Sequence, residues 1–342
     1  MFPIPTVPTA QELVDRALRR AAKATGKGQN RLERARRASV AKIQTVGDTI
    51  GTTLKKYVEA VPSLERLPEF QRELVDLLVG VGTLKHDLGA IDWCRDQVVR
   101  ICRQGARAAG RAKDPTEATR IRKAAYGRVS SLVNQIAPNL LSLAKARGHL
   151  VRVPDIDTEM PTIVVAGYPN VGKSQFVRAV STGKPKVAPY PFTTQGLGVG
   201  HLERRHRRYL VVDTPGLLDR PMAERNAVER QAVLALRHLA DAIVFLFDPT
   251  ETCGAPMEIQ ERLLAEIREA FPTAMIFEIE NKGDLEMPAR PNKTVEASMK
   301  PSSTSRRRVS ALTGEGCTEF METALAAITS RVPEGAPPLR VD

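Results

Sequence analysis

The segment Gly167–Ser174 constrains this chain more than any other, because its sequence, GYPNVGKS, fits the P-loop pattern G-x-x-x-x-G-K-S. The apolar run Thr162–Ala166 before it predicts a buried strand, and residues 172–180 have helical character. A P-loop joins a strand to a helix N-terminus, where backbone N–H groups and the helix dipole attract phosphate oxygens. The alternative is a chance match in a glycine-rich loop, which would not need a strand before it. The pattern therefore predicts a site for a nucleoside phosphate.

The two polar residues that end this motif have separate expected roles. Lys173 is expected to place its charge on the β- and γ-phosphates, and Ser174 to offer its hydroxyl to Mg²⁺. The rest of the loop is expected to line the nucleotide. We therefore assign these residues to nucleotide binding: Gly167, Tyr168, Pro169, Asn170, Val171, Gly172, Lys173, Ser174 and Gln175.

Basic residues are concentrated in the first half of the 342-residue chain. Residues 1–150 contain 27 Lys and Arg against 14 Asp and Glu, whereas residues 151–342 contain 24 and 25. This asymmetry indicates a polyanionic partner for the first half, unless the arginines only keep the chain soluble. There is no apolar run of the roughly 20 residues that a membrane span needs, no signal-peptide pattern and no paired cysteines, so we expect a cytoplasmic protein without structural zinc.

Helical periodicity dominates residues 1–150. Capping signals at Thr9 and Asp114 predict helices that begin near Ala10 and Pro115. Further helices are predicted over residues 31–61 and 65–79, and along an apolar stripe from Leu84 to Ile101 in whose packing we place Trp93. Pro138 should kink or break the last helix. We predict an all-α helical bundle over residues 1–150 and a linker over residues 151–161.

From Thr162 onward the pattern changes to strands that alternate with helices, which is typical of a mostly parallel sheet. The candidate strands are residues 162–166, 196–202, 209–213, 242–247, 274–279 and 308–310, and the candidate helices are residues 172–181, 222–240, 256–270 and 315–330. The short tip 203–208 favours an antiparallel hairpin. We predict one α/β nucleotide-binding domain over residues 162–332 and a short tail over 333–342.

Two further motifs suit the triphosphate end of a nucleotide. In the loop Pro191–Thr194 we expect Thr194, in preference to Thr193, to reach Mg²⁺ and the γ-phosphate and to change state when that phosphate leaves. In Asp213–Gly216, after an apolar strand, Asp213 is expected to hold Mg²⁺ through water and the N–H of Gly216 to meet the γ-phosphate. The predicted metal ligands are therefore Ser174, Thr194 and Asp213, and the predicted catalytic residues are Lys173, Thr194, Gly216 and Asn170.

The last two motifs suit a guanine base. Within Asn281–Lys282–Gly283–Asp284, the carboxylate of Asp284 can accept hydrogen bonds from the guanine N1–H and exocyclic amine, a donor pattern that adenine lacks. The backbone at Ser310 and Ala311 can read the guanine oxygen. Each motif alone is weak, but all five occur in order and at strand ends. The sequence therefore predicts an α/β P-loop GTPase domain with a mostly parallel, Ras-like sheet, which binds GTP or GDP with Mg²⁺ and follows an all-α helical bundle.

These motifs resemble GTPases of the Obg type, whose switch sequence is similar to Tyr190–Thr194. The chain resembles more closely the Nog family, the relatives of nucleolar GTP-binding protein 1, in their short archaeal form. Leu88–Trp93, Tyr126–Ser131 and Val165–Ser174 carry this resemblance, which covers almost the full chain. It implies a GTPase that acts in large ribosomal subunit assembly, with the pre-large ribosomal subunit, rRNA and ribosomal proteins as partners.

Leu217 stands where Ras-like enzymes place a glutamine that orients the attacking water, so we expect slow hydrolysis by the isolated protein. Asn170 stands where potassium-activated GTPases hold K⁺, which makes K⁺ a candidate activator; the alternative is that Asn170 only stabilises the loop turn. Two arginine runs are either RNA contacts or solvated faces, and the helical half is the favoured RNA-binding part. These runs are Arg204, Arg205, Arg207 and Arg208, and Arg306 to Arg308.

Three functions stay open at this point. The first is a molecular switch whose GTP state docks on a ribosomal precursor. The second is an Obg-like GTPase in translation control or stress signalling. The third is a nucleotide-binding scaffold with little hydrolysis, against which the intact Lys173, Ser174, Thr194 and Asp213 argue. The sequence indicates neither the rRNA site nor the oligomeric state.

Overall fold

The computed structural model of the protein describes residues 2–191, 196–204, 207–286 and 306–331. The chain forms two compact units. The helical unit comprises residues 1–67 and 78–151, and the sheet unit comprises residues 68–77 and 152–342. The segment 68–77, which the sequence placed within the helical bundle, thus belongs to the sheet unit.

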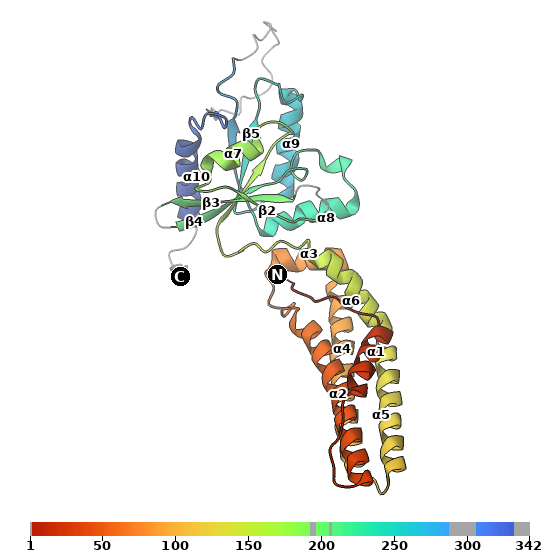
Figure 1. Cartoon of the computed structure of the whole chain (residues 1–342). Coiled ribbons are helices and arrows are strands. Elements are labelled where there is room, and N and C mark those ends of the chain that lie inside the picture. Colours follow the sequence, from red (N-terminus) through yellow and green to blue (C-terminus); the bar gives the residue numbers. More distant parts are fainter. Residues whose placement is uncertain (1, 192–195, 205–206, 287–305, 332–342) are drawn as a thin grey trace. The chain divides into compact units, whose positions relative to one another are not determined.

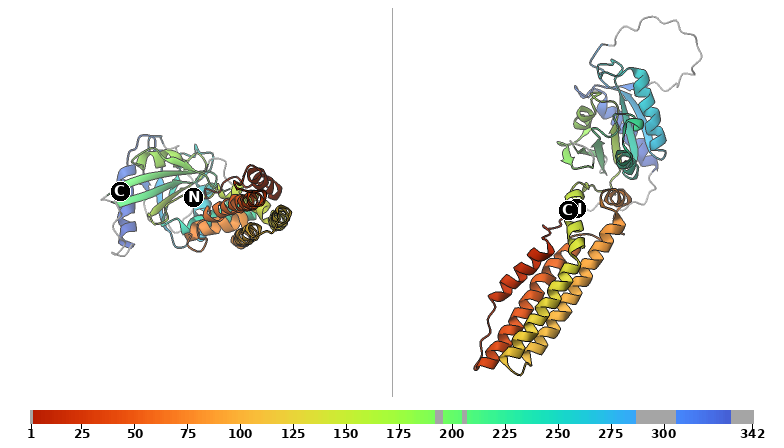
Figure 2. Two further views of the ribbon diagram at one scale, coloured as in Figure 1. Left: turned by 60° about the horizontal axis from the view of Figure 1, so that its bottom comes forward. Right: turned by 90° about the vertical axis from the view of Figure 1, so that its right-hand side faces the viewer.

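The helices of the helical unit begin at the predicted capping signals. Thr9 forms a capping box with Glu12, and the carboxylate of Asp114 accepts the N–H groups of Thr116 and Glu117. A break at Ile136 separates the last two helices, as Pro138 predicted. The described helices are α1 (Ala10–Ala22), α2 (Arg31–Glu59), α4 (Val81–Gly110), α5 (Pro115–Gln135) and α6 (Ala137–Leu150). Figure 2 shows α1, α2, α4 and α5 side by side.

Helix α4 buries the predicted apolar stripe, including Ile91, Cys94 and Val98. The prediction for Trp93 is wrong, because its side chain is 49% exposed. Trp93 follows Ile91 by two residues and therefore points about 200° away from it around the helix axis. The neighbouring helix α2 approaches α4 closely at Gly47, where an added Cβ would lie 2.8 Å from Cβ of Cys102.

The sheet unit contains a mostly parallel sheet with strand order β2-β3-β4-β1-β5-β6-β7 (Figure 1). Strand β1 pairs in parallel with β4 and β5, β6 pairs in parallel with β5 and β7, and the β2-β3-β4 edge is antiparallel. The predicted hairpin is confirmed as β3–β4, and the short exposed strand β2 was not predicted. The strands are β1 (Thr162–Ala166), β2 (Lys186–Ala188), β3 (Leu197–Arg204), β4 (Arg207–Asp213), β5 (Ala242–Phe247), β6 (Met275–Glu280) and β7 (Arg307–Arg308).

Helices cover both faces of this sheet. Phe176 of α7 and Phe320 of α10 meet edge to face on one side, within a core that includes Val165 and Leu246, and α9 packs on β5. The helix predicted over residues 222–240 is interrupted, because Asn226 caps a new helix start. The helices are α3 (Glu69–Val79), α7 (Lys173–Val180), η1 (Met222–Glu224), α8 (Ala227–Ala235), η2 (Leu236–His238), α9 (Met257–Ala270) and α10 (Cys317–Arg331).

Contacts of Phe70 explain why α3 belongs to the sheet unit. Its buried ring stacks on Tyr190 with centroids 6.3 Å apart, and the neighbouring Gln71 donates to the carbonyl of Ile156 at 3.2 Å. The segment 68–77 carries three acidic residues and one basic residue, so the helical unit without it has 26 Lys and Arg against 11 Asp and Glu. The helical unit is therefore more basic than the first 150 residues taken together.

Across the described ranges, none of the helices has both the length and the apolar character that membrane crossing requires. The four cysteines, Cys94, Cys102, Cys253 and Cys317, are free and buried.

The close approach of α2 and α4 predicts opposite effects for the same substitution at two helical glycines. Gly47→Ala should lower the free energy of unfolding by about 1–3 kcal/mol, because its methyl group must displace Cys102. Gly89→Ala in α4 has no atom within 4 Å of the new methyl group and should raise stability by about 0.5–1 kcal/mol through helix propensity. Urea unfolding followed by circular dichroism measures both. Equal effects at the two sites would contradict this packing.

Candidate nucleotide-binding site

The P-loop connects β1 to the N-terminus of α7, and two of its glycines are required by their surroundings. Gly167 has φ +140°, and a Cβ there would lie 2.6 Å from the carbonyl oxygen of Leu246. Gly172 has φ +99°, and a Cβ there would lie 2.3 Å from Nδ2 of Asn281. Only glycine tolerates both these backbone angles and these distances. The loop is therefore held in shape by neighbouring strands as well as by its own sequence.

Lys173 is buried against this loop, with 7% of its surface exposed. Its Nζ donates to the carbonyl oxygens of Gly167 at 2.8 Å and Tyr168 at 2.9 Å. Burial lowers the pKa of Lys173, while the carboxylates of Asp219 and Asp213 act in the opposite direction. The ammonium group is thus positioned inside the loop where the sequence places the phosphates.

Ser174 and Asp213 are brought together at the carboxyl ends of β1 and β4. The Ser174 hydroxyl donates to Oδ2 of Asp213, while the buried Oδ1 has no hydrogen-bond partner among the described residues. Desolvation raises the pKa of Asp213, opposed by the Ser174 hydrogen bond and the charge of Lys173. A hydroxyl beside a carboxylate with an unused oxygen is a donor set that suits Mg²⁺. The third predicted ligand, Thr194, lies outside the described residues together with Thr193.

The two guanine motifs are joined to the P-loop by the side chain of Asn281, which is 1% exposed. Its Nδ2 donates to the carbonyl oxygen of Val171 at 2.7 Å, and its Oδ1 accepts the N–H of Ala311 at 2.8 Å. The hydroxyl of Ser310 donates to the exposed carboxylate of Asp284 at 2.6 Å. The structure therefore brings three separate sequence motifs into one site. The N–H of Ala311 serves this connection, and its predicted contact with the guanine oxygen stays a prediction.

Sequence reasoning missed Asp248, which is fully buried at the end of β5. Its Oδ2 lies 2.6 Å from Nζ of Lys282 and accepts the N–H of Cys253, and its Oδ1 accepts the Thr250 hydroxyl. Burial acts to raise the pKa of Asp248, but the hydrogen bonds from Lys282, Thr250 and Cys253 together lower it. The signal in the sequence was an aspartate at the carboxyl end of an apolar strand: Asp248 directly follows β5, and Asp213 is the last residue of β4.

Gly216, Leu217 and Asn170 lie at the same end of the sheet. Gly216 has φ +77° and donates its N–H to Oδ2 of Asp219 at 2.8 Å. Leu217 is 2% exposed. Asn170 has φ +62°, a left-handed conformation that asparagine tolerates better than most residues, so its role in the turn is visible here. Whether it also holds K⁺ stays a prediction.

With this geometry established, comparison with known proteins identifies the family. Residues 3–157 match the profile described as the NOG1 N-terminal helical domain, and residues 162–282 match the profile of a 50S ribosome-binding GTPase. An uncharacterized protein of Methanocaldococcus jannaschii is 38% identical over 286 residues, which are 82% of this chain and 80% of that protein. The chain belongs to the NOG1 family. It is a GTP-binding protein with a GTPase domain, which confirms the predicted fold class and the predicted resemblance.

Other NOG1 relatives are longer than this chain. Nucleolar GTP-binding protein 1 of Saccharomyces cerevisiae is 31% identical over 288 residues, and the match covers 83% of this chain but 44% of the yeast protein. The chain thus spans less than half the length of that relative. The crystal structure of the putative nucleolar GTP-binding protein 1 from Plasmodium falciparum is 30% identical, covers 52% of this chain and 90% of the solved one, and has a TM-score of 0.42.

The raised pKa of Asp213 predicts that its charge destabilises the fold when Mg²⁺ and nucleotide are removed. Its pKa is higher in the folded than in the unfolded protein, so the penalty is present at neutral pH and vanishes as the pH falls below the unfolded value of about 3.8. Asp213→Asn should therefore raise the melting temperature at pH 7 in EDTA by about 2–4 °C. Scanning calorimetry at pH 7 and pH 4 measures the difference, which should shrink at the lower pH.

Asp241→Asn is the matched control for this measurement. The exposed Asp241 carboxylate accepts the N–H of Thr162 at 2.7 Å at the opposite end of β1. Its neutralisation should bring no gain in melting temperature. A lower melting temperature for Asp213→Asn in EDTA would contradict the predicted penalty.

Proposed function

We propose that this chain is a GTP-hydrolysing molecular switch that acts in assembly of the large ribosomal subunit. The observation that carries the proposal is the pairing of a strongly basic helical unit of the NOG1 type with a GTPase domain whose guanine and phosphate motifs meet at Asn281. The names of relatives such as nucleolar GTP-binding protein 1 of yeast and of Drosophila melanogaster support the ribosomal role. The cytoplasmic location stays a prediction.

In this function the nucleotide lies across the carboxyl edge of the sheet. Asp284 accepts hydrogen bonds from the guanine base, and the P-loop residues Gly167–Gln175 surround the α- and β-phosphates. Lys173 and the N–H of Gly216 contact the γ-phosphate, where negative charge must be stabilised during phosphoryl transfer. Lys282 keeps this end in place through its ion pair with Asp248.

Ser174 and Asp213 are the residues that would hold Mg²⁺, together with Thr194. When bound, the ion neutralises charge on the β- and γ-phosphates. The Oδ1 atom of Asp213, which has no hydrogen-bond partner among the described residues, supports this assignment. A buried carboxylate oxygen without a partner is unfavourable unless a ligand binds it.

Hydrolysis by the isolated protein is expected to be slow. Leu217 occupies the position of the water-orienting glutamine, and its buried aliphatic side chain has no polar atom for a water molecule. A partner or an ion therefore has to assist, and K⁺ at Asn170 is one candidate. Such a low basal rate suits a switch that hydrolyses GTP only when its client is in place.

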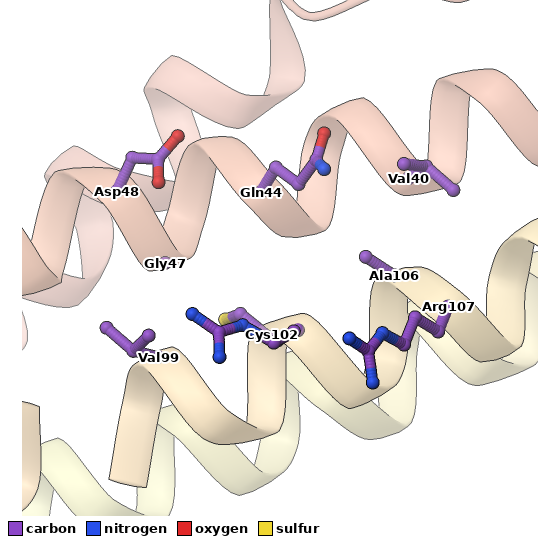
Figure 3. A pocket seen from close by; sticks show the side chains of 9 residues that line it. Val40, Gln44, Gly47, Asp48, Val99, Cys102, Ala106 and Arg107 are labelled. Carbon is purple, nitrogen blue, oxygen red and sulfur yellow. The ribbon is translucent and has the colours of Figure 1, made fainter. Parts of the chain in front are cut away.

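The RNA-binding face is proposed to lie on the helical unit. Arg100, Arg103 and Arg107 follow one face of α4, and Arg111 continues it just after the helix ends. All four are exposed and form no ion pair with a described residue. Arg103 and Arg107 also line a groove of about 430 Å³ between α2 and α4 (Figure 3). Its lining residues are Val40, Gln44, Gly47, Asp48, Val99, Cys102, Arg103, Ala106 and Arg107.

In the arginine run 306–308, Arg306 and Arg308 instead contact other residues of the sheet unit. Arg306 pairs with Glu261 and Glu278 and lies 3.8 Å from the ring centroid of Phe247, and Arg308 donates to the carbonyl of Leu285. At the hairpin tip Arg208 pairs with Glu203, and Arg205 lies outside the described residues. These contacts favour α4 over the run 306–308 as the surface for RNA phosphates, whereas at the hairpin tip Arg208 alone among the described arginines forms an ion pair.

Asp284→Asn tests the assignment of the base contact. The amide can no longer accept two hydrogen bonds from guanine but can pair with the carbonyl of xanthine, so GDP affinity should fall by roughly 10²-fold or more and XDP should bind better than GDP. Isothermal titration with GDP, XDP and ADP measures the change. Glu286→Gln, an equivalent charge change two residues along the chain, is the control and should leave GDP affinity within twofold. Unchanged GDP binding by Asp284→Asn would remove the assignment.

The ribosomal role is tested by sedimentation of the full chain with large-subunit precursors on sucrose gradients. Co-sedimentation should depend on a non-hydrolysable GTP analogue, and in titrations with rRNA the logarithm of affinity should fall with the logarithm of salt concentration. Replacing Arg100, Arg103 and Arg107 by Gln should weaken rRNA binding and reduce this slope by roughly 2–3, at about 0.7–0.9 for each lost phosphate contact.

The matched control replaces Arg204, Arg207 and Arg208 at the hairpin tip by Gln, with the same loss of charge, and should change the slope little. The reverse pattern would move the RNA contact to the sheet unit. Absence of the protein from precursor particles with either nucleotide would favour translation control over assembly.

A further inference from the structure

The carboxylate of Asp219 occupies a specific position beside the phosphate-binding groups. Its Oδ2 accepts the N–H of Gly216 at 2.8 Å, and its Oδ1 lies 3.7 Å from Nη2 of Arg225. Against the effect of burial, which lowers the pKa of Lys173, the negative charges of Asp219 and Asp213 both act to raise it. The Asp219 carboxylate thus binds the N–H of Gly216 and also favours the charged form of Lys173.

A γ-phosphate would need the same two groups. The N–H of Gly216 can make one strong hydrogen bond, and a phosphate oxygen beside the Asp219 carboxylate would add repulsion between like charges. GDP has no γ-phosphate and can bind without disturbing this contact. The carboxylate therefore opposes GTP more than it opposes GDP.

Arg225 provides a second position for the displaced carboxylate. It is 4% exposed, and its Nη1 and Nη2 donate to the carbonyl oxygens of Gly216 at 3.1 Å and Arg220 at 3.2 Å. Its buried Nε has no hydrogen-bond partner among the described residues. A buried guanidinium with an unused N–H is unfavourable, and a carboxylate is the group that such a donor binds most strongly. The unused N–H thus has a candidate partner in the adjacent Asp219.

We propose that Asp219 is a positioning residue that competes with the γ-phosphate of GTP for the N–H of Gly216 and moves onto Nε of Arg225 when GTP binds. This inference rests on the proposed function, because it assumes that Gly216 and Lys173 receive the γ-phosphate. Asp219 then lowers the preference for GTP over GDP, and Arg225 partly restores it. Asp219 and Arg225 together thus set the relative affinity of the protein for GTP and GDP.

The experiment measures the affinity of the full chain for GDP and for a non-hydrolysable GTP analogue, both with Mg²⁺, by isothermal titration. Asp219→Ala should tighten binding of the analogue by roughly tenfold and change GDP affinity by less than twofold, with Asp219→Asn in between. Arg225→Lys, which lacks the Nε donor, should weaken the analogue by several-fold and leave GDP within twofold. The two residues thus have opposite predicted signs.

Two controls separate competition from loss of structure. Glu224→Gln makes the same charge change on an exposed residue of the same segment, with no contact to Gly216, and should leave the ratio of the two affinities unchanged. In the double variant Asp219→Ala with Arg225→Lys, the second change should lower this ratio by less than it does in the wild type, because the part of its effect that passes through Asp219 is absent. A purely structural role would make the two changes additive.

The outcomes are distinct. If the wild-type chain binds neither nucleotide, the proposed function fails and this inference with it. If the wild type binds both nucleotides, but Asp219→Ala and Asp219→Asn have the same ratio of analogue to GDP affinity as the wild type, the nucleotide site stands and the competition is overturned. An equal change in both affinities would also overturn it, since GDP has no group that competes with Asp219.

Discussion

Parallel pairing of β1 with β4 and β5 is the constraint on which the rest of the sheet unit depends. Parallel strands place their carboxyl ends on one edge, so the residues that follow Ala166, Asp213, Phe247 and Glu280 meet there. The P-loop, the Gly216 segment, Asp248 and Asn281 are these residues. The central strands β1 and β5 are buried along their whole length, so polar groups that reach a ligand lie in the loops at this edge.

Polar groups at this edge differ in how far the protein itself satisfies them. Asp248 is fully buried but surrounded by donors, including the charged Nζ of Lys282, and its role is to hold neighbouring loops. Asp213 keeps one buried oxygen without a partner. Buried polar atoms usually find partners, and at this edge of the sheet a bound ligand can supply the partner that Asp213 lacks. Asp248, whose oxygens have hydrogen-bond partners within the protein, thus shapes the site, whereas Asp213 has an oxygen available to a ligand.

The two structural units do not correspond to two continuous stretches of the sequence. Residues 68–77 lie between two helices of the helical unit and have an ordinary helical pattern, but Phe70 is buried by stacking on Tyr190, which is 120 positions further along. Periodicity shows that a helix has an apolar face and does not show which surface covers it. Trp93 was placed in the packing of the apolar stripe because it lies among the residues of that stripe along the chain, although its position around α4 exposes it.

The sequence by itself determined the P-loop, the order of the strands and helices apart from β2, and the helix starts at Thr9 and Asp114, because each depends on local spacing and on the chemistry of a few side chains. Only the tertiary structure decided the contact of Asn281 with Val171 and Ala311, the burial of Asp248 against Lys282, and the contacts of Asp219 with Gly216 and Arg225. The contacts of Asn281 and Asp248 join residues from different loops, and their partners are fixed by the register of parallel strands, which no local pattern encodes. The contacts of Asp219 lie within the segment 216–225, whose folded path no sequence motif indicated.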